Sequence, residues 1–281
     1  MKLADLLQGG PLLFDGGMGT MLSRHGVPAD CDSGSANLRY PEIVADIHRE
    51  YLAAGAKVIS ANTFQANELR LGDQTEAAVS AAIAAARSAG AEIVALDIGP
   101  TGELLAPMGK LSYDRAFQVF SRQVLAGSAA GVDLILIETF FDPEEIKAAI
   151  AAAKEHTELP VIATMTFGER GRTITGATPA QAVAALEAAG VEALGVNCSY
   201  GPDQLLPVVE QMLALTRLPL LVQPNAGLPV FRDGKAEYDL TPDQFAQKLA
   251  AMAEMGVSML GGCCGTTPEH IAALSGRLKN K

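Results

Sequence analysis

The stretch LILIETFFDPEEIKAAIAAAKEHTELPVIATMTF, residues 134–167, joins two short apolar runs through an alanine-rich segment. The runs LILIETFF (134–141) and PVIATMTF (160–167) are almost continuously hydrophobic, which is typical of strands buried on both faces. The segment between them begins near Pro143 and has the composition of a helix. Together they predict two parallel strands joined by a crossover helix.

The same theme recurs along the whole chain. Six further apolar runs flank this unit: PLLFDGG (11–17), KVISANTF (57–64), EIVALDIG (92–99), ALGVNCS (193–199), PLLVQPN (219–225) and SMLGGCC (258–264). Helical patterns lie between them, at 41–56 and from near Ser112, Thr178, Asp203, Thr241 and Pro268. Eight strands with helical connections predict an α/β fold, a (β/α)₈ TIM barrel forming a single domain over residues 1–281. The alternative, an open doubly wound sheet, would favour fewer strands and a dinucleotide fingerprint.

Composition narrows the class of protein. The chain has 281 residues, of which 49% are hydrophobic and 19% charged, so its net charge of -11 does not indicate a disordered acidic protein. Without a Lys or Arg cluster, nucleic acid is not an expected partner. No segment reaches the ~18 consecutive apolar residues of a membrane span, and no signal peptide is recognisable, so we expect a cytoplasmic protein without membrane contact.

A barrel gathers its functional groups at the carboxyl ends of its strands. Here almost every apolar run ends in a side chain able to bind a ligand: Asp15, Asn62, Asp97, Glu138, Thr166, Cys198, Asn225 and Cys263–Cys264. Three of the four cysteines fall at these ends, and this clustering is the strongest functional signal in the residues themselves. Cys31, in a loop, is not expected to contribute.

The three strand-end thiols suggest a metal site. Cys198 follows the sixth predicted strand and Cys263–Cys264 follow the eighth, and these strands lie close together in a barrel. Thiolates are soft ligands for which Zn²⁺ is the common cytosolic partner, and three protein ligands leave one position for a substrate. Buried core cysteines and a vicinal disulfide remain the alternatives from the residues alone.

Glycines beside the paired cysteines favour the site. Gly261, Gly262 and Gly265 flank them, and glycine permits both unusual backbone angles and close approach.

The segment DGGMGT (15–20) is not a G-x-G-x-x-G nucleotide loop. It is better interpreted as a turn whose exposed backbone N–H groups can accept a small carboxylate. Asp15 and Glu138 could then hold a cationic amine, or they could serve as helix caps and salt-bridge partners. The four histidines are expected at the surface or in capping roles.

The motifs resemble a known family. The sequence is similar to the homocysteine S-methyltransferases, and within them to the homocysteine-binding barrel of cobalamin-dependent methionine synthase. The matching motifs span nearly the whole chain: FDGGMGT (14–20), SANTF (60–64), GPTGELL (99–105), IETF (137–140), GVNCSYGP (195–202), QPNAGLP (223–229) and GGCCGTTPEHI (261–271).

The resemblance implies a zinc ion held by Cys198, Cys263 and Cys264, with the sulfur of homocysteine as the fourth ligand. Zinc coordination deprotonates a thiol, so no catalytic histidine is needed. The substrate contacts implied by the same motifs involve the amino group, at Asp15 and Glu138, and the carboxylate, at backbone around Gly16–Gly17. Asn62 is also expected to contact the substrate. Asn225 matches the position that can occupy the open zinc site before substrate binds.

The methyl donor is the least determined part of this interpretation. The resemblance favours methylcobalamin carried on another domain or on a separate corrinoid protein. One alternative is a zinc subunit that presents the thiol and is inactive without a corrinoid partner. Others are S-methylmethionine or betaine as donor. A betaine site favours an aromatic cage, and this chain has no Trp and only 5% aromatic residues.

Overall fold

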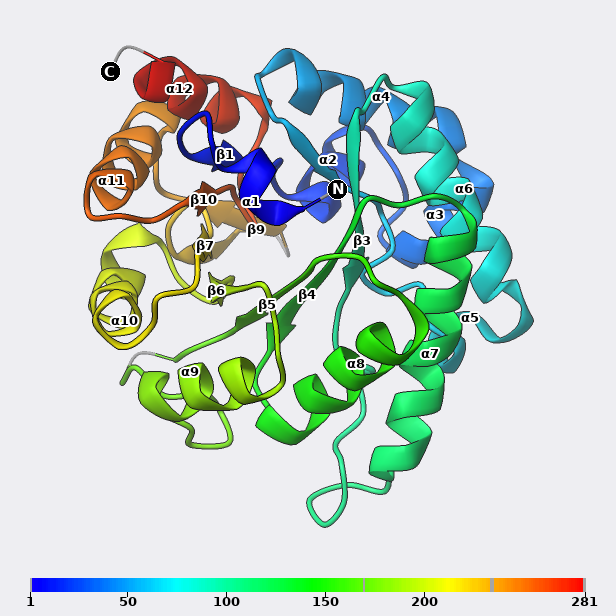
Figure 1. Ribbon diagram of the computed structural model, residues 1–281. Coiled ribbons are helices and arrows are strands. Elements are labelled where there is room, and N and C mark those ends of the chain that lie inside the picture. Colours follow the sequence, from blue (N-terminus) through cyan, green and yellow to red (C-terminus); the bar gives the residue numbers. More distant parts are fainter. Residues whose placement is uncertain (1, 169, 233–234, 280–281) are drawn as a thin grey trace.

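The eight predicted strands form one parallel sheet that closes into a barrel (Figure 1). The computed structural model describes residues 2–168, 170–232 and 235–279; residues 1 and 280–281, at the limits of the predicted domain, lie outside this part. The sheet runs β1-β10-β7-β6-β5-β4-β3-β2. A parallel bridge between Phe14 and Val58, and a 2.8 Å hydrogen bond from the Lys57 N–H to the Leu13 carbonyl, join β1 to β2. The barrel strands are β1 (Leu12–Leu13), β2 (Val58–Ser60), β3 (Ile93–Ile98), β4 (Leu134–Phe140), β5 (Val161–Met165), β6 (Ala193–Asn197), β7 (Leu220–Gln223) and β10 (Met259–Leu260).

Helices surround this sheet on its outer side, except α1, which lies over one end of the barrel (Figure 1). They are α1 (Leu3–Leu6), α2 (Met18–Arg24), α3 (Ser33–Arg39), α4 (Pro41–Ala53), α5 (Glu68–Leu71), α6 (Thr75–Ser88), α7 (Tyr113–Ala129), α8 (Pro143–His156), α9 (Pro179–Ala188), α10 (Pro202–Leu215), α11 (Pro242–Glu254) and α12 (Pro268–Lys279). A 3₁₀ turn, η1 (Gly72–Gln74), links α5 to α6, and a hairpin of β8 (Pro229–Arg232) and β9 (Lys235–Tyr238) follows β7. The predicted single-domain TIM barrel is confirmed. Within the described residues, no helix combines the length and apolar character needed to cross a membrane.

Threonine–proline pairs start two of these helices as their sequence indicates. The Thr178 and Thr241 side chains each accept the backbone N–H of the glutamine three residues later, and that glutamine side chain bonds back to the cap. Proline at the first helical position needs no hydrogen bond of its own. These capping boxes fix the points at which the chain leaves the loops at the mouth of the barrel.

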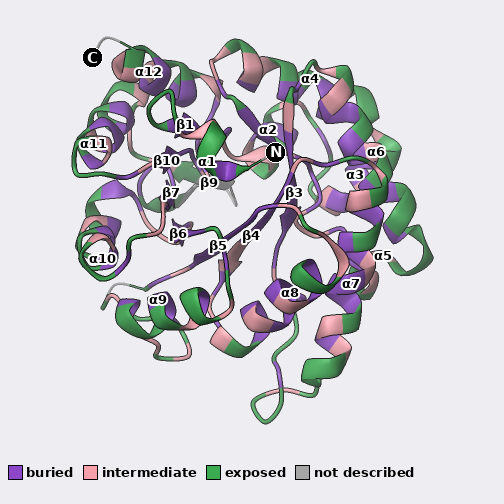
Figure 2. Ribbon diagram, in the orientation of Figure 1, coloured by how far each residue is buried: buried purple, intermediate pink, exposed green. Residues whose placement is uncertain are grey.

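The core has two parts, because strand side chains alternate between the barrel interior and the helix layer. One cluster fills the interior and includes Leu12, Val58, Leu136, Ile162 and Met259. Leu3 of α1 belongs to it, so α1 covers the end of the barrel where the strands begin. The larger cluster lies between strands and helices, and Figure 2 shows the strands and the inward faces of the helices as buried.

Above the apolar layer, the same alternation places polar side chains inside the barrel. Further inward positions along the central strands are polar and lie toward the carboxyl ends: Ser60, Asp97, Glu138, Thr164, Asn197 and Gln223. On β6, Gly195 lies between the apolar layer and Asn197. The barrel interior is therefore hydrophobic at its α1 end and polar at its mouth, where a ligand can enter.

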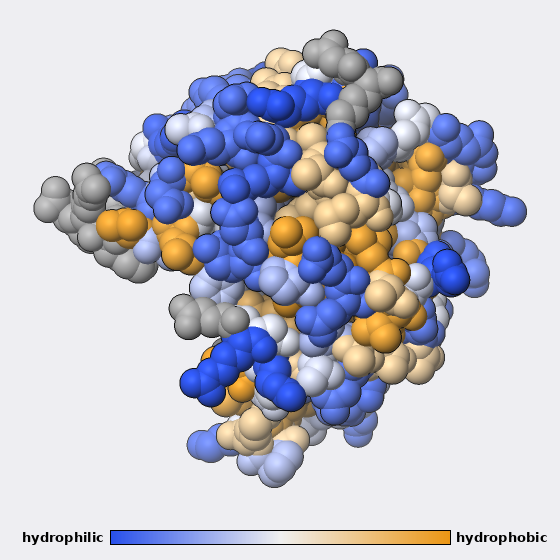
Figure 3. Space-filling model, turned by 90° about the vertical axis from the view of Figure 1, so that its left-hand side faces the viewer, coloured by the Kyte–Doolittle hydropathy of each residue, from blue (hydrophilic) through white to orange (hydrophobic). Residues whose placement is uncertain are grey.

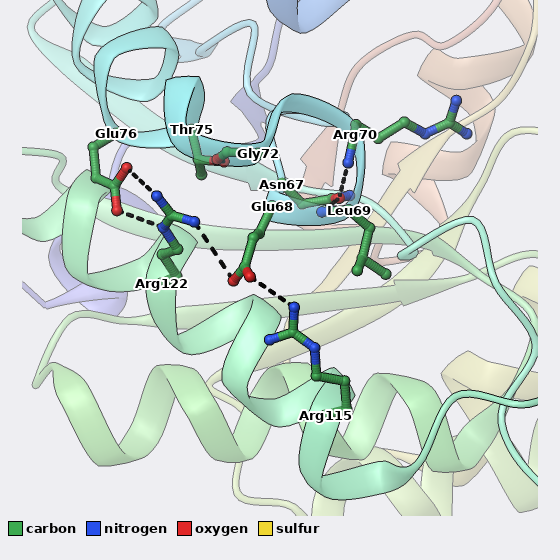
Figure 4. Close-up of polar contacts among 9 residues, drawn as sticks. All are labelled: Asn67, Glu68, Leu69, Arg70, Gly72, Thr75, Glu76, Arg115 and Arg122. Atoms are coloured by element: carbon green, nitrogen blue, oxygen red, sulfur yellow. Dashed lines mark hydrogen bonds and ion pairs between the residues drawn. The ribbon is translucent and has the colours of Figure 1, made fainter.

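Ion pairs orient α5 and α6 against α7 (Figure 4). Glu68 accepts a 2.7 Å bond from Arg115 and lies 3.7 Å from Arg122, whose guanidinium also binds both oxygens of Glu76. The hydrogen bond from Arg115 lowers the pKa of Glu68. Asn67 caps α5 by accepting the N–H groups of the second and third residues after it. Such exposed pairs contribute about 1 kcal/mol or less each, so they set orientation more than stability.

Several elements escaped the sequence analysis. The helices α1, α2, α3, α5 and α6, the η1 turn and the β8–β9 hairpin were not predicted, and β1 and β10 are shorter than their apolar runs. His48 corrects a second expectation, because its side chain on α4 is fully buried rather than at the surface. Neither of its ring nitrogens has a hydrogen-bond partner within the described part of the chain. Burial lowers the pKa of His48 to about 3, so the ring is neutral.

The buried His48 predicts acid sensitivity. Below its ordinary pKa of ~6.5 the unfolded chain protonates this ring while the folded protein does not, so stability is lost as pH falls from there toward 3. Between about pH 7.5 and about pH 5.5 this site should cost the wild type ~1.4 kcal/mol. His48→Phe should remove that part of the loss, measured by urea denaturation at both pH values. An identical pH slope in the two proteins would contradict this assignment.

Candidate functional site

Three cysteines meet at the mouth of the barrel. Cys198 follows β6, and Cys263 and Cys264 follow β10, with β7 between these strands in the sheet. Their sulfur atoms all lie within 4.8 Å of one another, and no other such metal-ligating group was found within the described residues. All are free, partly exposed thiols, whereas Cys31 lies outside the group. The sulfurs are thus close enough to share one ion.

The thiols already influence one another. The Cys264 sulfur accepts hydrogen bonds from Cys198 and Cys263, which lower the pKa of Cys264. Hydrogen bonds with Cys198 and Cys264, followed by burial, raise the pKa of Cys263. One thiolate stabilised by two thiols is the arrangement that a soft cation can replace, since metal binding displaces thiol protons.

The two glycine motifs interlock to hold the cysteines. The Gly17 N–H donates a 2.9 Å bond to the Thr266 hydroxyl, which itself donates to the Cys263 carbonyl at 2.6 Å. The Tyr51 hydroxyl reaches the carbonyls of both Gly17 and Thr266 at 3.3 and 3.2 Å. Tyr51 thus supports the site from α4 as well as filling the core.

The glycines act mainly through close packing. A Cβ on Gly17 would lie 2.6 Å from the Cys263 carbonyl oxygen, and one on Gly262 would lie 2.4 Å from the Thr266 hydroxyl. Of the three glycines beside the cysteines only Gly265 has a left-handed backbone, with φ of +79°. The expected freedom of backbone angle therefore applies to Gly265, while Gly261 and Gly262 are required for space.

Three carboxyl groups crowd the polar layer beside the thiols. Asp15 and Asp97 are 3% and 8% exposed, and Glu138 lies on β4 facing them. Burial raises the pKa of Asp15 to about 7, opposed by hydrogen bonding with Ser60, whose N–H lies 3.0 Å from the carboxylate. Burial and the charges of Asp15 and Cys264 raise the pKa of Glu138 to about 8. Burial and the charges of Glu138 and Asp15 also raise that of Asp97.

Such a group of carboxyls lacks a cation. No positively charged group contributes to the pKa shift of any of the three, and Asp97 Oδ1 has no hydrogen-bond partner within the described residues. Because a buried carboxylate needs a counter-charge, the arrangement suits a ligand ammonium group.

Comparison with known proteins decides the family. Residues 12–278 match the profile of the homocysteine S-methyltransferase family. The chain belongs to this family. It is 33% identical to methionine synthase from Mycobacterium tuberculosis over 99% of this chain and 25% of that protein. It is also 33% identical to the Mycobacterium leprae methionine synthase, over 92% of the chain and 24% of that protein. The chain thus spans about a quarter of the length of these relatives.

Solved structures agree with this assignment. The metallated form of the homocysteine methyltransferase MmuM from Escherichia coli has a TM-score of 0.83 and 26% identity, covering 98% of this chain and 99% of that one. Its apo form has a TM-score of 0.76 and 29% identity, covering 98% of both chains. The fold of this chain is therefore that of a family member over nearly its whole length.

The two predicted asparagines occupy different settings. Asn62 is buried, and its side-chain nitrogen donates to the Ser33 carbonyl at 2.7 Å and to Asn37 Oδ1 at 2.8 Å. Its amide therefore ties β2 to α3, leaving only the side-chain oxygen for a ligand. Asn225 is buried with its N–H bonded to the Tyr200 carbonyl, and its Oδ1 lacks a partner within the described residues. Asn225 thus retains an oxygen for a ligand.

Several residues at the site were not predicted from the sequence. Asp97 ends an apolar run but was given no role. Tyr238, on the unpredicted β8–β9 hairpin, packs on Gly265 and hydrogen-bonds the Cys264 sulfur. Asn197 directly precedes Cys198, and only the cysteine was assigned a role from the sequence. Only Asp97 could have been found from its place at a strand end, because the other two depend on contacts distant in the sequence.

A cavity of about 760 Å³ is walled in part by the loop that follows Cys198. It lies between the loops after β5, β6 and β7, and Ser199 and Tyr200 in its wall directly follow Cys198. Arg170 and Arg172 give it positive charge, and Ile174 on its rim is 82% exposed. Figure 3 shows one side of the molecule as a mostly hydrophilic face with hydrophobic groups scattered over it. The mouth of the barrel therefore has an open cavity next to the loop after Cys198.

The tight contact at Gly17 predicts that adding one methyl group there lowers the free energy of unfolding, whereas the same change nearby does not. Gly17→Ala should destabilise the protein by ~1–3 kcal/mol, because its Cβ would press on the Cys263 carbonyl. Gly19→Ala, two residues along, meets no atom within 4 Å and should change stability by no more than ~1 kcal/mol. Urea denaturation of both variants measures the difference, and equal stabilities would show that this contact carries no constraint.

Proposed function

We propose that the chain is a zinc-dependent homocysteine S-methyltransferase whose barrel, residues 1–281, is the homocysteine-binding domain and whose product is methionine. The observation that carries the proposal is the meeting of three cysteine sulfurs, all within 4.8 Å, beside buried carboxyls at one barrel mouth. The cysteine sulfurs suit a metal ion, and the buried carboxyls suit the amino group of an amino acid thiol.

The set of metal-ligating residues fits zinc. Cys198, Cys263 and Cys264 would supply three soft anionic ligands, which suit Zn²⁺ in preference to hard cations. The unpaired buried oxygen of Asn225 is suited to complete the set before substrate binds. Similarity to a protein solved in a metallated form supports this assignment.

The remaining residues would orient homocysteine. Asp15 and Glu138 would accept its ammonium group, which provides the counter-charge that their buried carboxylates lack. The substrate carboxylate would meet backbone at Gly16–Gly17, where the Gly17 N–H is already engaged with Thr266, so the N–H groups of Gly16 and the first turn of α2 are the proposed donors. The side-chain oxygen of Asn62 would contribute a further contact.

This binding mode aims the substrate sulfur at the metal-binding thiols. When bound, zinc would keep that sulfur deprotonated at neutral pH, where a free alkyl thiol with a pKa of ~8.5 is mostly protonated. Held at its amino group by Asp15 and Glu138, the substrate presents the sulfur toward the adjoining cavity. The sulfur attacks the donor's methyl carbon, forming the S–C bond while the electron pair of the broken bond stays with the donor.

We propose methylcobalamin, on another domain or a separate corrinoid protein, as the donor. Two features support this: similarity to methionine synthases four times as long as this chain, and the cavity beside Cys198. The same difference in length favours a second candidate, a zinc subunit that presents the thiol and is inactive without its corrinoid partner. S-methylmethionine and betaine remain alternative donors. The three adjacent thiols also call for a reducing compartment, for which we propose the cytoplasm.

A panel of methyl donors tests the proposal. Purified, zinc-loaded protein should form methionine from homocysteine with methylcobalamin, and not with betaine, S-methylmethionine or methyltetrahydrofolate. Methionine formed only from a corrinoid-loaded partner protein would instead establish the second candidate. Absence of methionine with every donor, despite one zinc per chain, would refute the methyltransferase role.

Cysteine variants test the metal ligands. Cys264→Ala should lose both zinc and turnover, because it leaves two thiols for the ion. Cys31→Ala is the matched control, since Cys31 is a free thiol outside the group, and it should keep both. Zinc is measured by elemental analysis after dialysis. Full zinc content in Cys264→Ala would contradict the assignment.

The carboxyl groups predict that amine recognition weakens in acid. Asp15 and Glu138 must be ionised to bind an ammonium group, and their raised pKa values of about 7 and about 8 mean that they protonate as pH falls below 8. Homocysteine should therefore lose its affinity advantage over 4-mercaptobutyrate, which has the same thiol without the amine, between about pH 8 and about pH 6. Calorimetric Kd values measure this ratio, which Glu138→Gln should make lower and flatter. A ratio independent of pH in the wild type would exclude these carboxyls as the amine site.

A further inference from the structure

Two strand ends at the mouth adopt backbone that their residues disfavour. Thr139 of β4 has φ of 67°, and Cys198 and Ser199 after β6 have φ of 61° and 60°. The left-handed region is costly for residues with a Cβ and worst for β-branched residues such as threonine. Such conformations persist only where neighbouring groups impose them, and they gather at functional sites.

The strain in β4 coincides with a bulge. Between the pairs Ile137–Ala163 and Phe140–Met165, β4 contains one more residue than β5. A bulge interrupts the ladder of hydrogen bonds and re-aims the side chains beside it. Here Glu138 and Thr139 are the residues in the irregular stretch, so the bulge sets the direction of the Glu138 carboxyl.

Asn197 supplies the contacts that the bulge removes. Its Oδ1 accepts the Thr139 N–H at 2.8 Å, and its Nδ2 donates to the Thr139 hydroxyl at 2.8 Å. The same oxygen accepts the Thr164 hydroxyl at 2.7 Å. The side chain, which is fully buried, therefore reaches from β6 past β5 to β4 and clamps both the backbone and the side chain of Thr139.

The Asn197 backbone is fixed as firmly as its side chain. Its carbonyl accepts the Thr166 hydroxyl at 3.0 Å, and the next residue, Cys198, donates its N–H to the Gln223 carbonyl at 3.0 Å. One residue thus touches the bulge on one side and adjoins a cysteine of the metal-binding group on the other. Movement of either strand end must be transmitted to the other through this side chain.

We propose that Asn197 is a positioning residue that locks the end of β4 to the end of β6, so that the Glu138 carboxylate and the Cys198 thiolate keep one fixed separation. This inference rests on the proposed function, in which Glu138 meets the substrate amine and Cys198 the metal. Because only three carbons join the amine of homocysteine to its sulfur, its reach is limited, and the separation of these two groups decides whether both ends can bind at once.

The test removes the amide and then relieves the strain that it supports. Asn197→Ala should raise the KM for homocysteine by ~10–100-fold, the usual cost of losing a group that orients a metal or substrate ligand, with a smaller change in kcat. It should also weaken Co²⁺ binding, followed by the thiolate-to-cobalt absorption band. Asn197→Asp, which keeps the acceptor oxygen for Thr139 and Thr164, should fall between wild type and Asn197→Ala. Thr139→Gly tolerates the left-handed backbone without support, so adding it to Asn197→Ala should restore part of the lost homocysteine affinity.

Asn67→Ala is the matched control, since Asn67 is also a buried asparagine but caps α5. It should lower stability while leaving KM and Co²⁺ affinity near wild type. A KM and a Co²⁺ affinity of Asn197→Ala matching those of Asn67→Ala would overturn the inference, and so would a failure of Thr139→Gly to restore any affinity. The wild-type arm judges the proposed function separately: if wild type forms no methionine, the Co²⁺ comparison between Asn197→Ala and Asn67→Ala still decides the role of Asn197 at the thiols.

Discussion

Everything at the mouth depends on the alternation of strand side chains between the barrel interior and the surrounding helices. Eight parallel strands give the interior only a few positions per layer, and in this chain one layer is apolar and the next polar. The apolar layer excludes water from below, so the carboxyls above it are poorly solvated. Their raised pKa values follow from that placement more than from any single neighbour. The chemistry of the site is thus a product of where the hydrophobic layer stops.

The second constraint is crowding between the glycine loops after β1 and β10. Gly17, Thr266 and Cys263 are joined by short hydrogen bonds in a space that admits no extra carbon. Adjacent cysteines have few ways to aim both sulfurs at one point, and a loop that packs backbone against backbone restricts them further. The loops therefore pre-organise the thiols, which lowers the cost of gathering them around an ion.

The barrel and its cysteine group were predictable because they depend on local patterns. Long apolar runs mark buried strands, and Thr-Pro-x-Gln marks helix starts, so 134–140 and 161–165 formed as strands nearly where expected. The convergence of Cys198 with Cys263 followed from strand order alone. The Asn197 clamp could not be predicted, because it needs a bulge and a left-handed threonine that no local preference favours. The burial of His48 was equally hidden, since helical spacing shows which face a residue shares but not how deeply that face is covered.

The position of α1 has a consequence for the order of events. Leu3 and the apolar layer close the barrel where its strands begin. In the proposed reaction, substrates and product must therefore enter and leave through the mouth at the opposite end. There the small amino acid would occupy the deep part of the mouth, and the bulky donor would occupy its outer part. A donor in that outer part would bind after the amino acid and leave before its methylated form. A barrel closed at one end thus favours ordered binding and release of the two substrates.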